Sequence, residues 1–581
     1  MSPGFRLIGA IVSGALLCVA EPVSSQSAAI EVQVEGLAGP LRDNVLATLS
    51  VSRYRDQPGL TETSIRRLHA RAPDEIRAAL RPFGYYEPSI DAALDSRSGR
   101  WRARYTINAG EPVRVAHVEV ILDGPGASDP EFAPPKTAPR RGERLLHPKY
   151  EALKQHYLTT AADRGYLDAA FTLSELRVSA AARTADMELH FATGKRYRFG
   201  PITLEQDILD DEFVARFVSF EEGDHYSIGD LLALQYALTD SEYFTLVEVD
   251  ARRENAEGLA VPVTVRMEPR RRHRYTAGVG YATDTGPRVL AGWENRRINA
   301  QGHRVAADLE VSEVRYAFNT RYVIPLRNPV WERLTIAANV LEEELGDVES
   351  SRAELVLAHT KRNGRWQQTL AGRLSRERDL LAGTQTYVTQ FVPQGSWLYS
   401  GGETGVRARN GYRLGIDVAA SDEILGAPTR FLQLKTRLRT MHPVGERDRL
   451  LLRIEVGTTL ATNADLLPSS QRFFAGGDAS VRGYRYNELG TVDVNGNVIG
   501  GKHLLTASAE YEHWFSERWG AAVFVDAGNA FRDFGDSVRK SAGVGLRWGL
   551  PFAVVALDVA QPIADPNDSS FRFHLTLGVD L

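Results

Sequence analysis

The sequence predicts a transmembrane antiparallel β-barrel of about sixteen strands, preceded by three small α+β domains. Three observations predict it: an export-type N-terminal segment, a repeat in the first half, and a strict alternation of apolar and polar residues in the second half. The chain has 581 residues. Single hydrophobic cores stop growing at roughly 250 to 300 residues, so several domains are expected.

Residues 1–29 have the composition and order of a secretory signal peptide. Arg6 precedes an apolar run from Leu7 to Ala20, and small residues follow as far as Ala29. The run is short for a membrane-spanning helix, and no later segment offers a continuous apolar run of the length such a helix needs. We therefore expect an exported protein whose only cysteine, Cys18, leaves with the signal, so that no disulfide or cysteine-ligated metal is present.

Charge and motif content argue against several functions. The formal net charge is -5 and the signs are interspersed, so no basic stripe suggests nucleic acid as a partner. The segment from Gly496 to His503 is similar to a phosphate-binding loop, but His503 stands where that loop needs Ser or Thr. The sequence has no Gly-x-Ser-x-Gly elbow and no His-Glu-x-x-His motif. We expect no enzymatic activity, no cofactor and no metal.

Residues 30–270 show weak self-similarity at a period of roughly 80 residues, which suits tandem small domains. We place the three units at 30–111, 112–193 and 194–270. In each, a helical stretch ends in an aromatic turn before a strand; the three turns are Pro82-Phe83-Gly84-Tyr85, Arg164-Gly165-Tyr166-Leu167 and Ser241-Glu242-Tyr243-Phe244. Apolar residues recur at helical spacing in Tyr150 to Ala162 and in Ile228 to Leu238. Each unit is predicted to have the order β-α-α-β-β, although three unrelated domains would also fit.

From residue 271 to residue 581, apolar and polar residues alternate with a period of two. In the last segment one face carries only apolar side chains: Phe571, Phe573, Leu575, Leu577, Val579 and Leu581. A soluble sandwich also alternates in this way. The export signal and the charged residues in the middle of the polar faces favour a membrane barrel. At about 19 residues per strand and turn, this region provides about sixteen strands, an even number as bacterial barrels require.

The segment from Gln471 to Tyr484, QRFFAGGDASVRGY, is more specific than any periodicity. It resembles the long sixth loop of the outer-membrane assembly superfamily that includes BamA, TamA and the two-partner secretion transporters. The hallmark of that loop is an apolar residue followed by Arg-Gly and an aromatic residue. The residues that carry the resemblance are Gly477, Asp478, Val481, Arg482, Gly483 and Tyr484.

The resemblance implies three periplasmic POTRA domains at the unit boundaries given above, followed by the barrel. Three POTRA domains without a plug helix look like the TamA branch of the superfamily. In this family the loop folds back into the barrel lumen, where its arginine meets carboxylates on the wall; the matching residues here are Glu510 and Asp526. By themselves, Arg482 and these two carboxylates could equally be solvated lumen residues.

The resemblance also implies a kink at Gly578, which would weaken the pairing of the final strand with the first strand near Tyr275 to Ala282. Taken alone, Gly578 could be a small residue that faces the lumen. The implied function is an outer-membrane assembly factor that inserts or secretes proteins such as autotransporters through this seam, with an inner-membrane-anchored, TamB-like partner. The alternatives are a passive pore, a two-partner secretion transporter, or envelope lipid transport with the same partner.

Overall fold

The computed structural model describes residues 30–55, 57, 60–97, 100–283, 285–403, 405, 407–533, 536–551, 553–563 and 570–578. The predicted signal peptide with Cys18, and Val579 and Leu581 of the predicted last strand, lie outside these residues. No helix within the described ranges is long and apolar enough to cross a membrane. The same ranges contain no group of His, Cys, Asp and Glu residues suited to a metal ion.

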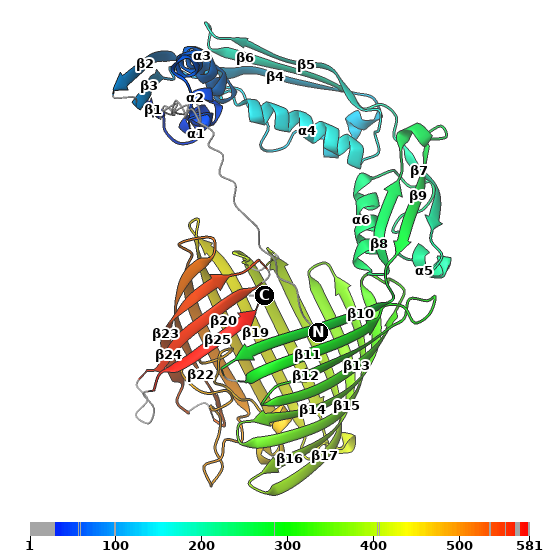
Figure 1. Cartoon of the computed structure of the whole chain (residues 1–581). Helices are drawn as coiled ribbons and strands as arrows, with labels where there is room; N and C mark the ends of the chain where they lie inside the picture. The colour runs from blue at the N-terminus through cyan, green and yellow to red at the C-terminus, as the bar shows by residue number, and fades with distance from the viewer. Residues whose placement is uncertain are drawn as a thin grey trace, which may run out of the picture. The chain divides into compact units, whose positions relative to one another are not determined.

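The first small domain packs helices against a three-stranded sheet of order β1-β3-β2, in which β1 runs parallel to β3 (Figure 1). The elements are β1 (Ile30–Glu35), α1 (Gly39–Thr48), α2 (Ser50–Arg53), α3 (Glu62–Leu80), η1 (Arg81–Phe83), β2 (Ser89–Arg97) and β3 (Arg100–Asn108). Ile65, Ile76 and Leu80 of α3 are fully buried against Ala103 and Tyr105 of β3.

The second small domain has a sheet of the same order, β4-β6-β5, but a single α-helix among its described residues. Its elements are β4 (Arg114–Asp123), η2 (Pro125–Ser128), η3 (Pro130–Phe132), α4 (His147–Asp163), β5 (Ala170–Ser179) and β6 (Thr184–Ala192). The predicted β-α-α-β-β order is therefore wrong here. Five prolines at positions 125, 130, 134, 135 and 139 deny the first helical segment its donors, so only 3₁₀ turns form.

The third small domain has the predicted order, with sheet order β7-β9-β8. Its elements are β7 (Arg198–Glu205), α5 (Asp211–Ala215), α6 (Ile228–Asp240), β8 (Phe244–Asp250) and β9 (Ala260–Pro269). The three aromatic turns all pass through a left-handed residue: Gly84 at φ 86°, Gly165 at φ 81° and Glu242 at φ 59°. The third turn thus uses a glutamate in a conformation that favours glycine.

Sixteen strands, β10 to β25, form one antiparallel sheet in sequence order, which confirms the predicted barrel. The strands are β10 (His273–Ala282), β11 (Gly286–Asn295), β12 (Arg304–Val311), β13 (Arg315–Pro325), β14 (Glu332–Leu345), β15 (Val348–Asn363), β16 (Trp366–Leu381), β17 (Thr384–Gly402), β18 (Gly411–Ser421), β19 (Phe431–Val444), β20 (Asp448–Ala461), β21 (His503–His513), β22 (Trp519–Phe531), β23 (Arg539–Gly549), β24 (Val554–Pro562) and β25 (Arg572–Gly578). The first two small domains belong to one compact unit, and most of the third belongs to a second unit with the barrel.

The barrel closes between β10 and β25, which lie beside each other in its wall (Figure 1). Among residues 273–283 and 570–578, these two strands form no backbone ladder. One bond crosses the gap, from the backbone N–H of Leu575 to Oγ1 of Thr283 at 3.3 Å. β25 has seven residues, whereas β17 has nineteen. Within these described residues, the seam is therefore held by fewer hydrogen bonds than the strand pairs beside it.

Candidate functional site in the barrel lumen

The connection between β20 and β21, residues 462–502, lies against the inner face of the barrel. Three isolated bridges fold it back on itself, Phe473 with Gly501, Ala475 with Leu489, and Val492 with Val498. An apolar cluster joins the loop to the wall; its buried residues are Phe473, Ala475, Val481, Tyr484, Leu489, Leu504 and Ala530. Because these side chains leave water together, the loop is packed as a small core and not as a mobile surface segment.

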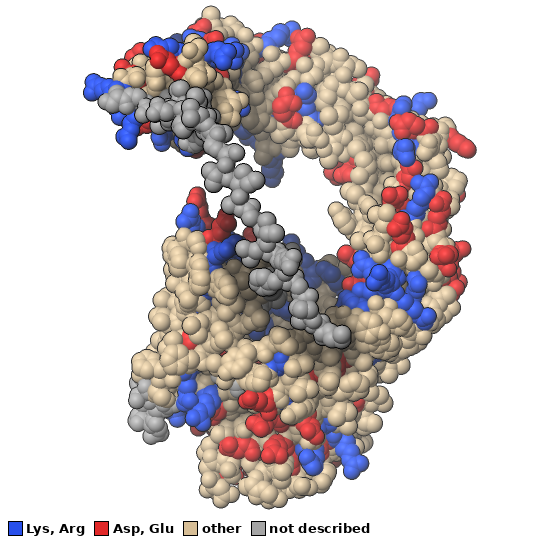
Figure 2. All heavy atoms as spheres, viewed as in Figure 1, with Lys and Arg blue, Asp and Glu red and all other residues tan. Residues whose placement is uncertain are grey.

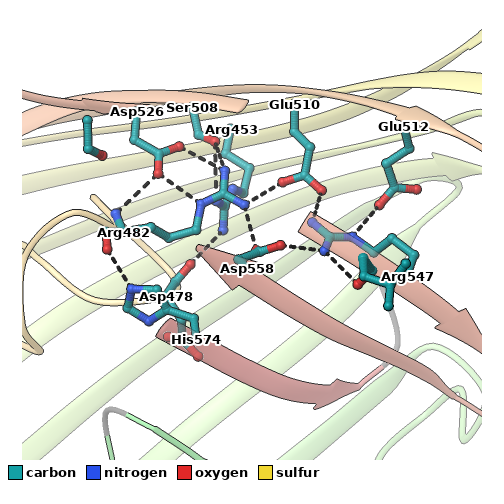
Figure 3. Close-up of polar contacts among 12 residues, drawn as sticks. Arg453, Asp478, Arg482, Ser508, Glu510, Glu512, Asp526, Arg547, Asp558 and His574 are labelled. Atoms are coloured by element: carbon teal, nitrogen blue, oxygen red, sulfur yellow. Dashed lines mark hydrogen bonds and ion pairs between the residues drawn. The ribbon is translucent and has the colours of Figure 1, made fainter. Parts of the chain in front are cut away.

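Arg482 projects from this loop into a group of wall carboxylates (Figure 3). Its Nε and Nη2 atoms donate to the two oxygens of Asp526 at 2.8 and 2.9 Å, a planar fork. Its Nη1 atom donates to Glu510 at 2.6 Å and to Asp558 at 3.0 Å. The guanidinium also lies over the Phe524 ring, with Cζ 3.3 Å from the ring centroid.

Arg482 is 3% exposed, and its charge is compensated on every side. Burial acts to lower the pKa of Arg482, but the hydrogen bond and charge of Asp526, with the charges of Glu510 and Asp558, outweigh it and raise the pKa above its ordinary value. The guanidinium stays charged. It acts as a permanent electrostatic anchor and offers no proton for acid-base chemistry.

The network continues beyond the residues that the sequence predicted. Arg547 bridges Glu510, Glu512 and Asp558, and Arg449 donates to Glu512 at 2.6 Å. Arg453 donates to Ser508 at 3.2 Å and to the backbone oxygen of Asp478 at 3.4 Å. Four arginines thus meet four carboxylates. Figure 3 shows Arg453, Arg482 and Arg547 with Glu510, Glu512, Asp526 and Asp558, and Arg449 joins them through Glu512. All belong to the loop or to the wall formed by β20 to β24.

The other loop residues predicted from the sequence shape the backbone around Arg482. Gly483 donates its N–H to Ser541 at 3.2 Å, and an added Cβ there would lie 2.5 Å from Cβ of Ser541. Gly477, at φ 96°, donates to the backbone oxygen of Tyr484 at 3.0 Å, and Tyr484 donates to Val481 at 3.1 Å. Val481 and Tyr484 are buried in the apolar cluster. Asp478 contributes its backbone oxygen to Arg453.

A second anchor, missed from the sequence, fastens the base of the loop to β16. Ser469 donates its backbone N–H and hydroxyl to Asp379 at 2.8 and 2.6 Å. Ser470 does the same to Glu377 at 3.0 and 2.5 Å. Glu377 and Asp379 are two residues apart on one strand, so the sequence alone indicates that their carboxylates lie on the same face. Nothing in the sequence, however, assigns them to two serines some 90 positions later.

The last strand also contacts the loop. His574 donates from Nε2 to the backbone oxygen of Arg482. Gly578, at the end of the described part of β25, lies opposite Val554 of β24. The structure therefore brings Arg482, Glu510 and Asp526 into direct contact and leaves Gly578 apart from them, at the end of the seam strand.

Comparison with known proteins agrees with this architecture. The model of the Omp85 superfamily domain matches residues 299–580, and that of POTRA domain TamA domain 1 matches residues 31–109. The outer membrane protein assembly factor BamA of Nitratidesulfovibrio vulgaris is 26% identical over 165 residues, which cover 26% of this chain and 21% of that protein. The chain thus aligns with about a fifth of that relative's length.

Two solved structures are similar in fold. BamA from Haemophilus ducreyi lacking POTRA domains 1–3 superposes with a TM-score of 0.64 at 17% identity, covering 80% of this chain and 99% of that one. CdiB from Acinetobacter baumannii gives a TM-score of 0.47 at 13% identity, covering 80% and 90%. The former match supports the fold of the barrel and of the small domain before it.

Proposed function

We propose that the protein is an outer-membrane assembly factor, because residues 299–580 match the Omp85 superfamily domain and residues 31–109 match the TamA-type POTRA domain. The barrel lies in the outer membrane and the POTRA domains lie in the periplasm. The proposed activity is the insertion or secretion of β-barrel proteins such as autotransporters. The description of the BamA relative as an assembly factor supports this activity.

The observation that carries the proposal is the seam between β10 and β25. In the described residues one backbone-to-side-chain bond crosses it, so separating these strands costs less than separating any fully laddered pair. The separated strands would present unpaired edges, which template the addition of another strand. We propose that Gly578 kinks β25 and keeps this seam short.

A disulfide across the seam tests the proposal. Thr283→Cys paired with Leu575→Cys places thiols on residues that already share a hydrogen bond, and neighbouring pairs are scanned because disulfides need Cα atoms within about 7 Å. The matched control is Ala277→Cys with Ala291→Cys, registered partners within β10 and β11. We expect the seam crosslink to abolish autotransporter display, reductant to restore it, and the control crosslink to have no effect. Full display with a quantitatively crosslinked seam would refute the opening mechanism.

The finer assignment places the protein in the TamA branch, with a TamB-like inner-membrane-anchored partner that binds the POTRA domains. Copurification of the full chain from crosslinked envelopes tests this partner directly, and absence of such a protein from the eluate would contradict it. A passive pore is disfavoured because the loop anchored through Arg482 occupies the lumen. A lipid-transfer assay distinguishes envelope lipid transport with the same partner from protein assembly. A secretion assay with a single substrate distinguishes two-partner secretion from assembly.

A further inference from the structure

A dense group of arginines lies where the third small domain continues into the barrel, and Figure 2 shows a concentration of basic side chains there. Six belong to the segment between β9 and β10, the start of β10, and the turn after β11: Arg270, Arg271, Arg272, Arg274, Arg296 and Arg297. All six belong to the compact unit that holds the barrel and most of the third domain, so they form a single surface, which we call the basic corner.

Three of the six arginines hold the corner together. Arg272 donates to the backbone oxygens of Arg297 and Ile298 at 2.8 and 3.0 Å. Arg274 and Arg296 share the carboxylate of Glu242 at 3.3 and 3.4 Å. These contacts join the turn of the third domain to the first two barrel strands.

The other three arginines retain uncompensated charge. In the described part of the chain, the side chains of Arg270 and Arg271 form no hydrogen bond or ion pair. Nη1 of Arg297 is buried without a hydrogen-bond partner. Burial and the neighbouring charge of Arg272 lower the pKa of Arg297, and Asp207 offsets them only in part. Buried donors are normally hydrogen-bonded, and a guanidinium forms its strongest hydrogen bonds with anionic oxygens, so this group indicates a bound anion.

The position of these arginines on the barrel wall indicates which anion. On β10 and β11 the outward side chains form registered pairs, Val279 with Val289, Ala277 with Ala291, Tyr275 with Trp293, and His273 with Asn295. The backbone bond from Arg296 N–H to Arg272 O continues this ladder by one step. Arg271 and Arg297 come directly after this step, just beyond the ends of the two strands.

Toward the start of β10 the apolar face passes from aliphatic to aromatic side chains, and the arginines follow just beyond the strand ends. Val279 is 83% exposed and Tyr275 is 75% exposed. They alternate with Thr276, Gly278 and Gly280, so they lie on the apolar face of the strand, which contacts the bilayer in a membrane barrel. This order follows a membrane interface: acyl chains, then the interfacial belt, then the phosphate layer. β10 follows the periplasmic domains directly, so its first residues mark the periplasmic leaflet.

We propose that Arg270, Arg271 and Arg297 form a binding surface for the headgroup phosphates of anionic phospholipids in the periplasmic leaflet, at the foot of β10. The aliphatic and aromatic wall above them takes the acyl chains of the same lipids. A soluble acidic protein or free phosphate would use the charge alone and would leave the continuous apolar wall unexplained. This inference holds whether or not the barrel assembles other proteins.

The test compares two double variants of the full chain purified in detergent. Arg270→Gln with Arg271→Gln removes one half-buried and one exposed charge from the corner. Arg140→Gln with Arg141→Gln removes two exposed charges from the second small domain. Each protein is mixed with phosphatidylglycerol and phosphatidylcholine of identical acyl chains, and the retained lipids are counted by native mass spectrometry. A heat-dependent shift of the barrel band in electrophoresis verifies folding.

We expect the preference for phosphatidylglycerol to fall by about fivefold per arginine removed, hence up to about 25-fold, in the corner variant alone. Sodium phosphate should displace the lipid no more than sodium chloride of equal ionic strength. Unchanged preference in a folded corner variant would overturn the proposal. So would an equal loss in the control variant, or complete displacement by inorganic phosphate, which would indicate a site for free anions.

Discussion

Replacing Arg482 with alanine should release the loop from the lumen wall while the strand ladder stays intact. The variant leaves the carboxylate of Asp526 without its arginine partner. Asp526 is 2% exposed, and its remaining hydrogen bond comes from the backbone N–H of residue 482 at 3.1 Å. Glu510 and Asp558 keep Arg547 as a partner. Removing one partner of a buried ion pair costs about 3 to 5 kcal/mol. Here this free energy destabilises the state in which the loop is bound to the lumen wall, relative to the released state.

Loop release can be measured as the labelling rate of a buried thiol. Ala475 lies in the apolar cluster and is 1% exposed, so Ala475→Cys reacts with a maleimide only when the loop leaves the wall. A change of about 3 to 5 kcal/mol predicts labelling faster by about a hundredfold to a few thousandfold in the Arg482→Ala background. Arg482→Lys, which keeps the charge but loses the fork, should fall between wild type and alanine.

Arg485→Ala is the matched control, because this exposed arginine lies three residues further along the same loop. It should label at the wild-type rate. In the double variant Asp526→Asn with Arg482→Ala, the loss of loop-binding free energy should be smaller than the sum of the two single losses. Each single change removes the same pair of hydrogen bonds between the two side chains. A wild-type labelling rate for Arg482→Ala would refute the anchoring argument, and normal autotransporter display with a released loop would separate anchoring from function.

Three further changes test other parts of the structure. Gly483→Ala forces its Cβ to within 2.5 Å of Ser541 and should loosen the loop by about 1 to 3 kcal/mol in the same labelling assay, whereas Gly415→Ala, with no close contact, should not. Glu377→Gln weakens the serine anchor at the loop base, so labelling should accelerate by about tenfold or more; no change would exclude that anchor. Burial lowers the pKa of His147, so its neutral form favours the folded state; stability should decline as the pH falls below about 6.5. Amide exchange around α4 should show this decline, and His147→Gln should remove it.

Strand number, lumen loop and repeated domains could be predicted because each leaves a periodic or compositional mark. The alternation on β10 to β25 fixes which side chains face lipid, and the left-handed turns at Gly84 and Gly165 are marked by their glycines. The sequence also contains the reason why the second domain lacks its first helix, because prolines are concentrated in the segment after β4. The repeat with the other two domains predicts a helix there, but the prolines prevent it.

The full extent of the lumen network could not be predicted from one sequence. Glu510 and Asp526 were named through the resemblance of the loop motif, but Asp558 and Arg547 lie on strands whose polar faces carry many charged residues. Which of these meet depends on strand register and barrel shear, and neither is encoded by a local pattern. His574 is likewise an ordinary inward residue until β25 is placed beside the loop.

The attachment of the two seam strands differs, and this gives the barrel a mechanical polarity. β25 is held to the loop through His574 and the backbone of Arg482, and the loop is fastened to β16 and to β21, β22 and β24. β10 is instead continuous with the third domain and tied to it through Arg274 and Glu242. A pull on the third domain would therefore act on β10 first, while the loop holds the neighbouring β25. The proposed opening of the seam would therefore move β10 together with the third domain, away from a β25 that the loop holds in place.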